Sequence, residues 1–254
     1  MSGRSEARVA LVTGGGKGVG AGIVKVLAGH GVRCCINCNT NPAMAEDTLT
    51  AVEAAGGEAF VYRADVTDGG QLQAMVDAVV DRWGRLDILV NNAAMQPNSY
   101  IDGYDYDTLR RLWEINVGGY FHAVRACLPH LRAAECGRVV NLCSIHGKRP
   151  TCFDAGYAMT KGAIRMFTRE LALELFADGI TVNAIDLGGC KIEFKTGRAP
   201  FHSKNPLDCN NPDLQALRLV TPEDVGHLVW YLCSPQAAAL TGDGIRVDKG
   251  AVLI

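Results

Sequence analysis

Short apolar runs alternate with amphipathic stretches from one end of the chain to the other. The runs with the composition of strands are Val9–Val12, Arg33–Ile36, Ala59–Tyr62, Leu86–Val90, Arg138–Leu142, Ile180–Ile185 and Ile245–Val247. The stretches with helical periodicity are Ala21–His30, Met44–Ala55, Gln71–Trp83, Ala155–Phe176 and Pro222–Cys233. Strands that are apolar on both faces must be covered on both sides. The pattern therefore predicts an α/β fold: a doubly wound parallel sheet of about seven strands in one domain spanning residues 1–254.

Composition narrows the class of protein. Hydrophobic residues make up 48% of the chain and charged residues 20%, which suits a large buried core. The net charge of −2 gives no reason to expect nucleic acid or an anionic membrane as partner. No apolar stretch approaches the ~20 residues that a membrane-spanning helix needs. Met1–Arg8 lacks the apolar segment of a secretory signal, so we expect a cytoplasmic protein without membrane contact.

The chain has ten cysteines, most of them inside apolar segments such as those of Cys127, Cys143 and Cys233. In a reducing compartment such residues behave as small buried hydrophobes. Cys35 and Cys38 form one CxxC, but no second ligand pair stands at a suitable spacing. On a strand these two side chains also point to opposite faces. We therefore predict no metal site.

A glycine-rich turn follows the first predicted strand and reads Thr13-Gly14-Gly15-Gly16-Lys17-Gly18-Val19-Gly20. Glycines permit a tight turn and a close approach of a pyrophosphate to the backbone. The helix that follows presents free N–H groups to that anion. A turn without a ligand is the alternative, but the position at the first strand–helix junction favours a dinucleotide site. Its expected contacts are Gly14, Gly16, Lys17, Gly18, Val19 and Gly20.

The second strand bears on the choice of cofactor. NAD sites usually place an acid at the end of this strand, where it binds the ribose hydroxyls. Here Cys38 occupies that position, and no carboxylate appears before Glu46. The next residues offer donors to a 2′-phosphate: Asn39, Thr40 and Asn41. We expect NADP(H), with NAD(H) as the alternative, and Lys17 or Arg33 as the cations within reach.

A tyrosine and a lysine four residues apart, Tyr157 and Lys161, lie on one face of a predicted helix. A neighbouring ammonium stabilises a phenolate, which brings a tyrosine closer to use as an acid or base at neutral pH. Ser144 follows a predicted strand, at the edge where parallel sheets bind ligands, and can hold a substrate oxygen. Asn92 and Asn116 stand at similar places. Each has an ordinary alternative as a cap or turn residue, but four such placements at strand ends and on helices favour a functional site.

The TGxxxGxG turn together with Ser144, Tyr157 and Lys161 resembles the short-chain dehydrogenase/reductase family of the classical type. The resemblance extends from Val9 to about Gly250. It implies a Rossmann fold, an NAD(P)-dependent oxidoreductase that interconverts a ketone and a secondary alcohol, and a homo-oligomer, dimer or tetramer. The long helix Ala155–Phe176 and the C-terminal Val247–Ile254 are the expected surfaces of that oligomer.

By the same resemblance, Tyr157 is the general acid/base and Ser144 orients the reacting oxygen. Lys161 lowers the tyrosine pKa and binds ribose, and Asn116 helps to hold a water. Further cofactor contacts that the resemblance implies are Asp65 and Val66 at the adenine, Asn92 and Ala93 beneath the cofactor, and Gly188 and Cys190 near the nicotinamide.

The chain departs from the family pattern at several positions. Ala94 and Lys249 stand where glycine is common, and Thr160 stands where serine is common. Leu187 replaces a proline, and Ile192 replaces a threonine that would contact the nicotinamide. The catalytic roles survive these changes, whereas the anchoring of the nicotinamide loses a side-chain donor.

The substrate is the least determined feature. We expect the loop 188–217 to cover it, with Lys191 as a candidate contact; a solvated loop is the alternative. Ser-Ile-His-Gly at Ser144 resembles sugar dehydrogenases of the family, so His146 is either a contact for a second hydroxyl or a packing residue. A sugar, polyol or 3-oxoacyl compound is expected. The competing functions are a catalytically silent NADP(H) sensor and an extended epimerase or dehydratase, which the short length disfavours.

Overall fold

The computed structural model describes residues 7–150, 154–192 and 219–251. Its centre is a seven-stranded sheet in the order β3-β2-β1-β4-β5-β6-β7, with every neighbouring pair parallel. The strands are β1 (Val9–Val12), β2 (Arg33–Cys38), β3 (Ala59–Arg63), β4 (Ile88–Asn91), β5 (Arg138–Leu142), β6 (Thr181–Leu187) and β7 (Gly244–Val247). The predicted doubly wound parallel sheet is confirmed.

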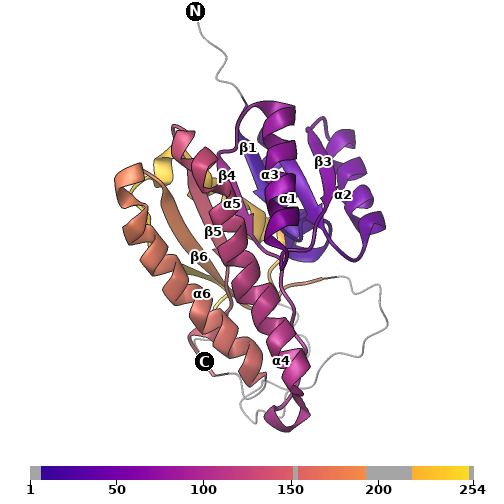
Figure 1. Ribbon diagram of the computed structural model, residues 1–254, viewed down its shortest axis with the longest axis vertical. Coiled ribbons are helices and arrows are strands. Elements are labelled where there is room, and N and C mark those ends of the chain that lie inside the picture. Colours follow the sequence, from indigo (N-terminus) through magenta and orange to yellow (C-terminus); the bar gives the residue numbers. More distant parts are fainter. Residues whose placement is uncertain (1–6, 151–153, 193–218, 252–254) are drawn as a thin grey trace, which may run out of the picture.

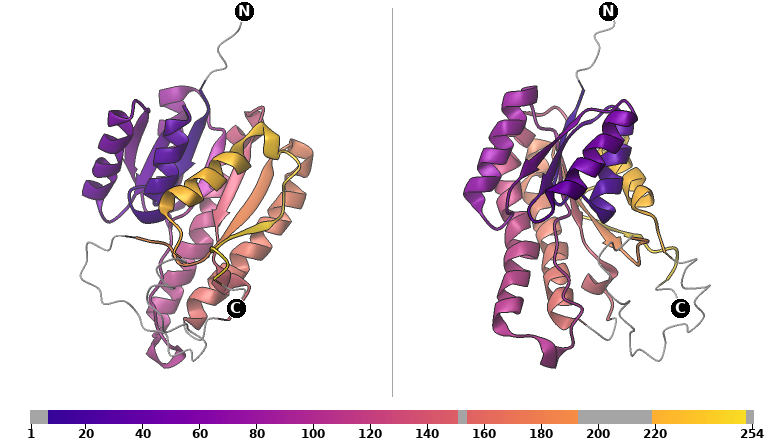
Figure 2. Two further views of the ribbon diagram at one scale, coloured as in Figure 1. Left: turned by 180° about the vertical axis from the view of Figure 1, so that it is seen from behind. Right: turned by 90° about the vertical axis from the view of Figure 1, so that its right-hand side faces the viewer.

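Helices cover both faces of the sheet. They are α1 (Gly18–Gly29), α2 (Pro42–Ala54), α3 (Gly69–Trp83), α4 (Tyr106–Trp113), α5 (Gly119–Ala133), α6 (Ala155–Glu174) and α8 (Pro222–Cys233). In Figure 1, α5 and α6 lie in front of the sheet, and the rear view in Figure 2 shows α8 across the other face. The start of α8 follows the sequence signals, with Thr221 in a reciprocal capping box and Pro222 at the first position.

The central strand shows why the apolar runs are nearly continuous. All four side chains of β1 are fully buried. Ala10 and Val12 point into the core beneath α1, α2 and α8, whereas Val9 and Leu11 point into the core beneath α3, α5 and α6. A strand buried on both faces cannot alternate with polar residues, so its sequence is a plain hydrophobic run.

The strand order reverses beside β1, because β2 lies on one side of it and β4 on the other. Val12 pairs with Ile36 on one side and with Val90 on the other, so the carboxyl ends of the three strands meet. In open α/β sheets this is the place where ligands bind. It brings the glycine turn together with Asn92, the residue that follows β4.

The segment between β4 and β5 contains helices to which the sequence assigned no range. There α4, a π-helical turn over Glu114–Gly118 and α5 follow one another as a nearly continuous rod (Figure 1). Gly118, Gly119 and Pro129 are poor helix formers, which weakens the helical pattern. Packing requires at least one of them, because a Cβ on Gly119 would lie 2.8 Å from the Val66 side chain.

None of the helices in the described part of the chain is long and apolar enough to cross a membrane. Within the same residues no group of histidines, cysteines and acids is arranged to hold a metal ion. Cys34, Cys35 and Cys38 are buried free thiols on β2. Burial raises the pKa of Cys34 to about 12, so this thiol is neutral and packs as a hydrophobe.

Candidate active site

The glycine turn between β1 and α1 has the geometry that only glycine accommodates easily. Gly14 and Gly18 have φ values of 61° and 53°, in the left-handed region. A Cβ on Gly16 would lie 2.7 Å from that of Ala45, and one on Gly20 would lie 2.3 Å from the Gly14 carbonyl oxygen. The backbone thus turns tightly and packs against both α1 and α2.

The start of α1 suits an anion. The N-cap residue, Lys17, makes no side-chain cap, and the first turn of α1 has no acidic residue. The N-terminal N–H groups and the positive end of the helix dipole therefore face the turn without a competing carboxylate.

Two asparagines fix the shape of this turn. The Asn92 amide donates to the carbonyl oxygens of Thr13 and Gly14 at 2.9 and 3.0 Å. The hydroxyl of Thr13 accepts from the backbone N–H of Asn92 at 2.9 Å and of Ala93 at 3.1 Å. Asn37 on β2, which the sequence did not single out, accepts from the Gly14 N–H at 3.1 Å. These bonds hold the turn against the ends of β2 and β4.

A cavity of about 460 Å³ opens above the turn. The predicted cofactor contacts that line it are Gly14, Gly16, Lys17, Gly18, Val19, Asn39, Thr40, Asn41, Asp65, Val66, Asn92 and Ala93. Gly20 lies buried beneath the turn. Met44, Arg111 and Ile115 also line the cavity and were missed, because they come from α2 and from the rod around Glu114–Gly118.

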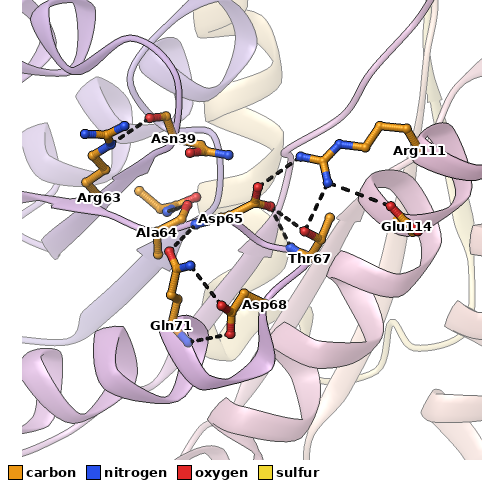
Figure 3. A network of polar contacts seen from close by, with 10 residues as sticks. Asn39, Arg63, Ala64, Asp65, Thr67, Asp68, Gln71, Arg111 and Glu114 are labelled. Carbon is orange, nitrogen blue, oxygen red and sulfur yellow. Dashed lines mark hydrogen bonds and ion pairs between the residues drawn. The ribbon is translucent and has the colours of Figure 1, made fainter. Parts of the chain in front are cut away.

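Asp65, the predicted adenine contact, is held by a polar network at the end of β3 (Figure 3). One carboxylate oxygen accepts from the backbone N–H and the hydroxyl of Thr67 at 2.9 and 2.7 Å. The other accepts from Arg111 on α4 at 2.9 Å. Partial burial opposes ionisation, but these bonds and the Arg111 charge lower the pKa of Asp65 to about 2. The carboxylate is therefore charged and fixed in orientation.

The cation that lies beside the end of β2 is not the one expected, and it comes from β3. Arg33 lies at the start of β2, at the opposite end from the cavity, where it pairs with Glu58 at 2.8 Å. The suggestion that Arg33 reaches the cofactor is therefore wrong. Arg63 instead donates its Nε–H to the Asn39 carbonyl oxygen at 3.0 Å. Asn41 caps α2 by accepting from the Met44 N–H at 3.3 Å.

A second cavity, of about 790 Å³, adjoins the first and shares lining residues with it, among them Lys17, Val19, Asn92 and Ile192. The predicted residues that line it are Ser144, His146, Tyr157, Lys161, Gly188 and Cys190. Lys191 is exposed and outside both cavities, with its backbone N–H bound to the Val220 carbonyl oxygen at 2.8 Å. Residues 193–217 of the expected substrate loop lie outside the described residues.

Tyr157 and Lys161 lie on one face of α6, as the spacing predicts. The Lys161 ammonium is 5.4 Å from the centre of the Tyr157 ring and donates to the Leu142 carbonyl oxygen at 2.7 Å. Burial, partly opposed by the Cys143 thiol, lowers the pKa of Lys161 to about 8. Burial raises the pKa of Tyr157, and the hydroxyl of Ser144 acts in the opposite direction. The pKa of Tyr157 is thus raised in this structure, whereas the resemblance implies a lowered one, and the phenol is neutral and able to donate a proton.

Asn116 occupies the π-helical turn and is fully buried. Its side-chain oxygen accepts from the Met95 N–H at 2.7 Å, and its amide donates to the Met95 carbonyl at 3.0 Å and to the Thr160 hydroxyl at 3.1 Å. Thr160 in turn donates to the Tyr157 carbonyl oxygen at 2.7 Å. This chain of bonds ties the loop after β4 to the first turns of α6. The expected role of Asn116 in holding a water stays a prediction.

His146 lies two residues after Ser144, and its ring contacts that of Tyr157. The ring centres of His146 and Tyr157 are 5.4 Å apart, in an edge-to-face arrangement. Burial lowers the pKa of His146, so the imidazole is neutral at pH 7. His146 lines the second cavity, and a neutral imidazole has one N–H donor and one acceptor nitrogen.

Three positions at or beside the departures from the family pattern can be located in the structure. Gly188 is required because a Cβ there would lie 2.6 Å from that of Asp248. Ile192 lies over the phosphate turn, where a Cβ on Gly18 would lie 3.4 Å from its side chain. Lys249 takes a φ of 47°, a conformation that suits the glycine common at this position. Nothing in the structure explains the choice of lysine there.

A glycine turn at the reversal of a parallel sheet and a serine, tyrosine and lysine beside the same crevice define a dinucleotide-binding oxidoreductase of the α/β class. The family model described as short chain dehydrogenase matches residues 8–200. The chain belongs to the short-chain dehydrogenase/reductase family and is an enzyme of the dehydrogenase/reductase class.

Named relatives cover nearly the full length of the chain. A 3-alpha-(or 20-beta)-hydroxysteroid dehydrogenase of Mycobacterium bovis is 34% identical over 99% of this chain and 92% of its own length. The putative ketoacyl reductase of the monensin polyketide synthase of Streptomyces virginiae is 33% identical over 97% and 98%. A short-chain dehydrogenase of Burkholderia cenocepacia, solved in complex with NADP, superimposes with a TM-score of 0.84 at 32% identity, over 97% of this chain and 98% of that one.

Proposed function

We propose that this protein is an NADP(H)-dependent oxidoreductase that interconverts a ketone and a secondary alcohol by hydride transfer. The observation that carries the proposal is the position of Ser144, Tyr157 and Lys161 on one cavity that adjoins the glycine-lined one. The cofactor, when bound, supplies the hydride chemistry. The glycine turn, the capless start of α1 and the fixed carboxylate of Asp65 fit its pyrophosphate and adenine.

The chain's own residues handle the proton. During reduction the phenolic O–H of Tyr157 donates its proton to the substrate oxygen, and in the reverse direction the phenolate accepts it. The Ser144 hydroxyl donates a hydrogen bond to the same oxygen and orients it. The Lys161 ammonium, fixed by the Leu142 carbonyl, favours the anionic phenolate that each reduction leaves behind. Bonds through Thr160 and Asn116 hold this helical turn in place.

NADP(H) is preferred to NAD(H) in this proposal because of charge. A carboxylate at the end of β2 would repel a 2′-phosphate, and Cys38 stands there instead. Lys17 on the adjoining turn adds a positive charge to the rim. The solved Burkholderia relative with NADP supports this preference by similarity.

For the substrate we propose a 3-oxoacyl compound or an alicyclic ketone. The apolar side chains of Leu142, Ile145, Leu187 and Ile192 on the second cavity support this choice, as do the names of the ketoacyl reductase and hydroxysteroid dehydrogenase relatives. A sugar or polyol is the second candidate, favoured by the neutral ring of His146 beside Tyr157. We propose that a single domain binds both the cofactor and the substrate.

We further propose a cytoplasmic homo-oligomer. Free thiols on β2 suit a reducing compartment. Exposed large apolar side chains on and directly after α5 and α6 suit a subunit interface: Phe121, Met159, Met166, Leu173 and Phe176. Sedimentation equilibrium tests this; a monomer at micromolar concentration would refute it.

A screen of 3-oxoacyl thioesters, alicyclic ketones and sugars tests the main proposal. With NADPH, the absorbance of the reduced nicotinamide falls if the compound is reduced; NADP+ with the matching alcohols gives the reverse reading. Turnover of any ketone supports an enzyme of the proposed class. Tight NADPH binding without turnover across the panel would instead favour a silent sensor, the alternative function.

A further inference from the structure

A basic side chain from the neighbouring strand reaches the carboxyl end of β2. Strands β2 and β3 pair in parallel, with Arg63 directly beside Cys38. The Arg63 Nε–H donates to the carbonyl oxygen of Asn39, the first residue beyond β2, at 3.0 Å. Figure 3 shows the guanidinium turned toward Asn39 at this strand end. Cys38 and Asn39 both line the cofactor cavity, so Arg63 is hydrogen-bonded to a residue of the cavity lining.

The rest of the guanidinium is available to a ligand. Arg63 is exposed and makes no ion pair with any residue in the described part of the chain. Only its Nε is engaged there, which leaves the two terminal NH₂ groups as donors. Because the Nε bond fixes the plane of the group, little side-chain freedom remains to be lost when an anion binds.

The other cations near the cavity are placed differently. The charge of Arg111 is matched by Asp65 at 2.9 Å, and Arg33 lies at the far end of β2 with Glu58. Lys17 is the N-cap residue of α1, in the glycine turn where the pyrophosphate is proposed to bind. Arg63 is thus the arginine beside the strand end where the ribose hydroxyls are read.

The local electrostatics agree with this geometry. Burial is the largest influence on the pKa of the Cys38 thiol and raises it. The charge of Arg63 lowers that pKa, and it acts more strongly than Glu46, which raises it. Of these two charges, the positive one therefore dominates at the strand end.

We propose that Arg63 binds the 2′-phosphate of NADP(H) and sets the preference of this site for NADP(H) over NAD(H). The inference rests on the proposed function, since it assigns a residue to the same cofactor site. A phosphate monoester carries close to two negative charges at pH 7, and the two NH₂ groups of an arginine bind its oxygens in a fork. An acidic residue at position 38 would form an ion pair with Arg63, whereas Cys38 leaves the guanidinium available to bind the phosphate.

Direct binding of the two reduced cofactors tests the assignment without knowledge of the substrate. The fluorescence of the reduced nicotinamide reports the Kd of NADPH and of NADH for the wild type, Arg63→Met, Arg63→Lys and Arg33→Met. Arg63→Met keeps the apolar stem and removes the charge. Arg33→Met is the control, an arginine at the other end of β2 whose Nε–H donates to Glu58 at 2.8 Å, away from the cofactor cavity. Thermal unfolding verifies that each variant is folded.

We expect the wild type to bind NADPH more tightly than NADH. Arg63→Met should raise the Kd of NADPH about tenfold, equal to 1.4 kcal/mol, and leave that of NADH unchanged. The Kd of NADPH for Arg63→Lys should lie between those of the wild type and Arg63→Met, and that for Arg33→Met should equal the wild-type value. Equal effects of Arg63→Met on both cofactors, no effect on either, or a wild type that prefers NADH would overturn the inference. If the wild type binds neither cofactor, the proposed function itself fails.

Discussion

The two hydrogen bonds of the Thr160 hydroxyl lead to a prediction that the family pattern alone does not give. Its buried hydroxyl accepts from Asn116 at 3.1 Å and donates to the Tyr157 carbonyl oxygen at 2.7 Å. Thr160→Val keeps the shape and removes both bonds. At about 0.5–1.5 kcal/mol for each, the free energy of unfolding should fall by about 1–3 kcal/mol. For a chain of this size that lowers Tm by about 2–12 °C.

The same substitution should also reduce turnover, because the tie positions the helical turn that bears Tyr157. We expect kcat to fall at least tenfold, a loss of about 1.4 kcal/mol in the barrier, with the Kd of NADPH unchanged. Thr160→Ser is the control, since it keeps the hydroxyl and loses one methyl group, at a cost of about 1 kcal/mol. Thermal unfolding and steady-state kinetics measure both effects. If the valine variant equals the serine variant in Tm and kcat, the positioning role of this hydroxyl is refuted.

Three further outcomes are expected. The backbone of Lys249 is strained, with a φ of 47° in the left-handed region. Lys249→Gly should therefore raise the free energy of unfolding, measured in denaturant, by about 0.5–1 kcal/mol. A lower free energy of unfolding would contradict this strain. Arg111→Met should weaken NADPH and NADH equally, about threefold to tenfold by fluorescence, since it releases Asp65 rather than a phosphate contact; a loss confined to NADPH would contradict this. Folding lowers the pKa of Lys161 from 10.5 to about 8, so the unfolded chain binds more protons than the folded chain between these pH values. The free energy of unfolding of the wild type, relative to that of Lys161→Met, should therefore rise with pH across this window. A decrease measured by chemical unfolding would contradict the burial of Lys161.

The parts of the fold that follow from local pattern could be predicted. The run Val9–Val12 is apolar throughout because β1 is buried on both faces, and Thr221-Pro222 begins α8 through local capping. The rod from α4 to α5 could not be assigned, because Gly119 and Pro129 disfavour a helix and only packing against the loop of Val66 requires the glycine.

The site divides in the same way. Tyr157 and Lys161 share one helix, so their spacing alone places them together. Arg63 could not be found by searching the turn after Cys38, because it arrives from another strand; the parallel register of β2 and β3 is the signal that pairs them. Arg111 contacts Asp65 from a helix that is distant in the sequence, and no pattern within either segment predicts that contact.

The central claim is that Tyr157 moves the proton at the substrate oxygen. Its most direct test compares Tyr157→Phe with Tyr106→Phe, which removes the hydroxyl of a tyrosine that is 90% exposed at the start of α4. With a ketone that the wild type reduces, we expect kcat for Tyr157→Phe to fall by about 10²–10⁴, with the Kd of NADPH unchanged and Tyr106→Phe fully active. Ketone reduction by Tyr157→Phe at the wild-type rate would contradict the claim.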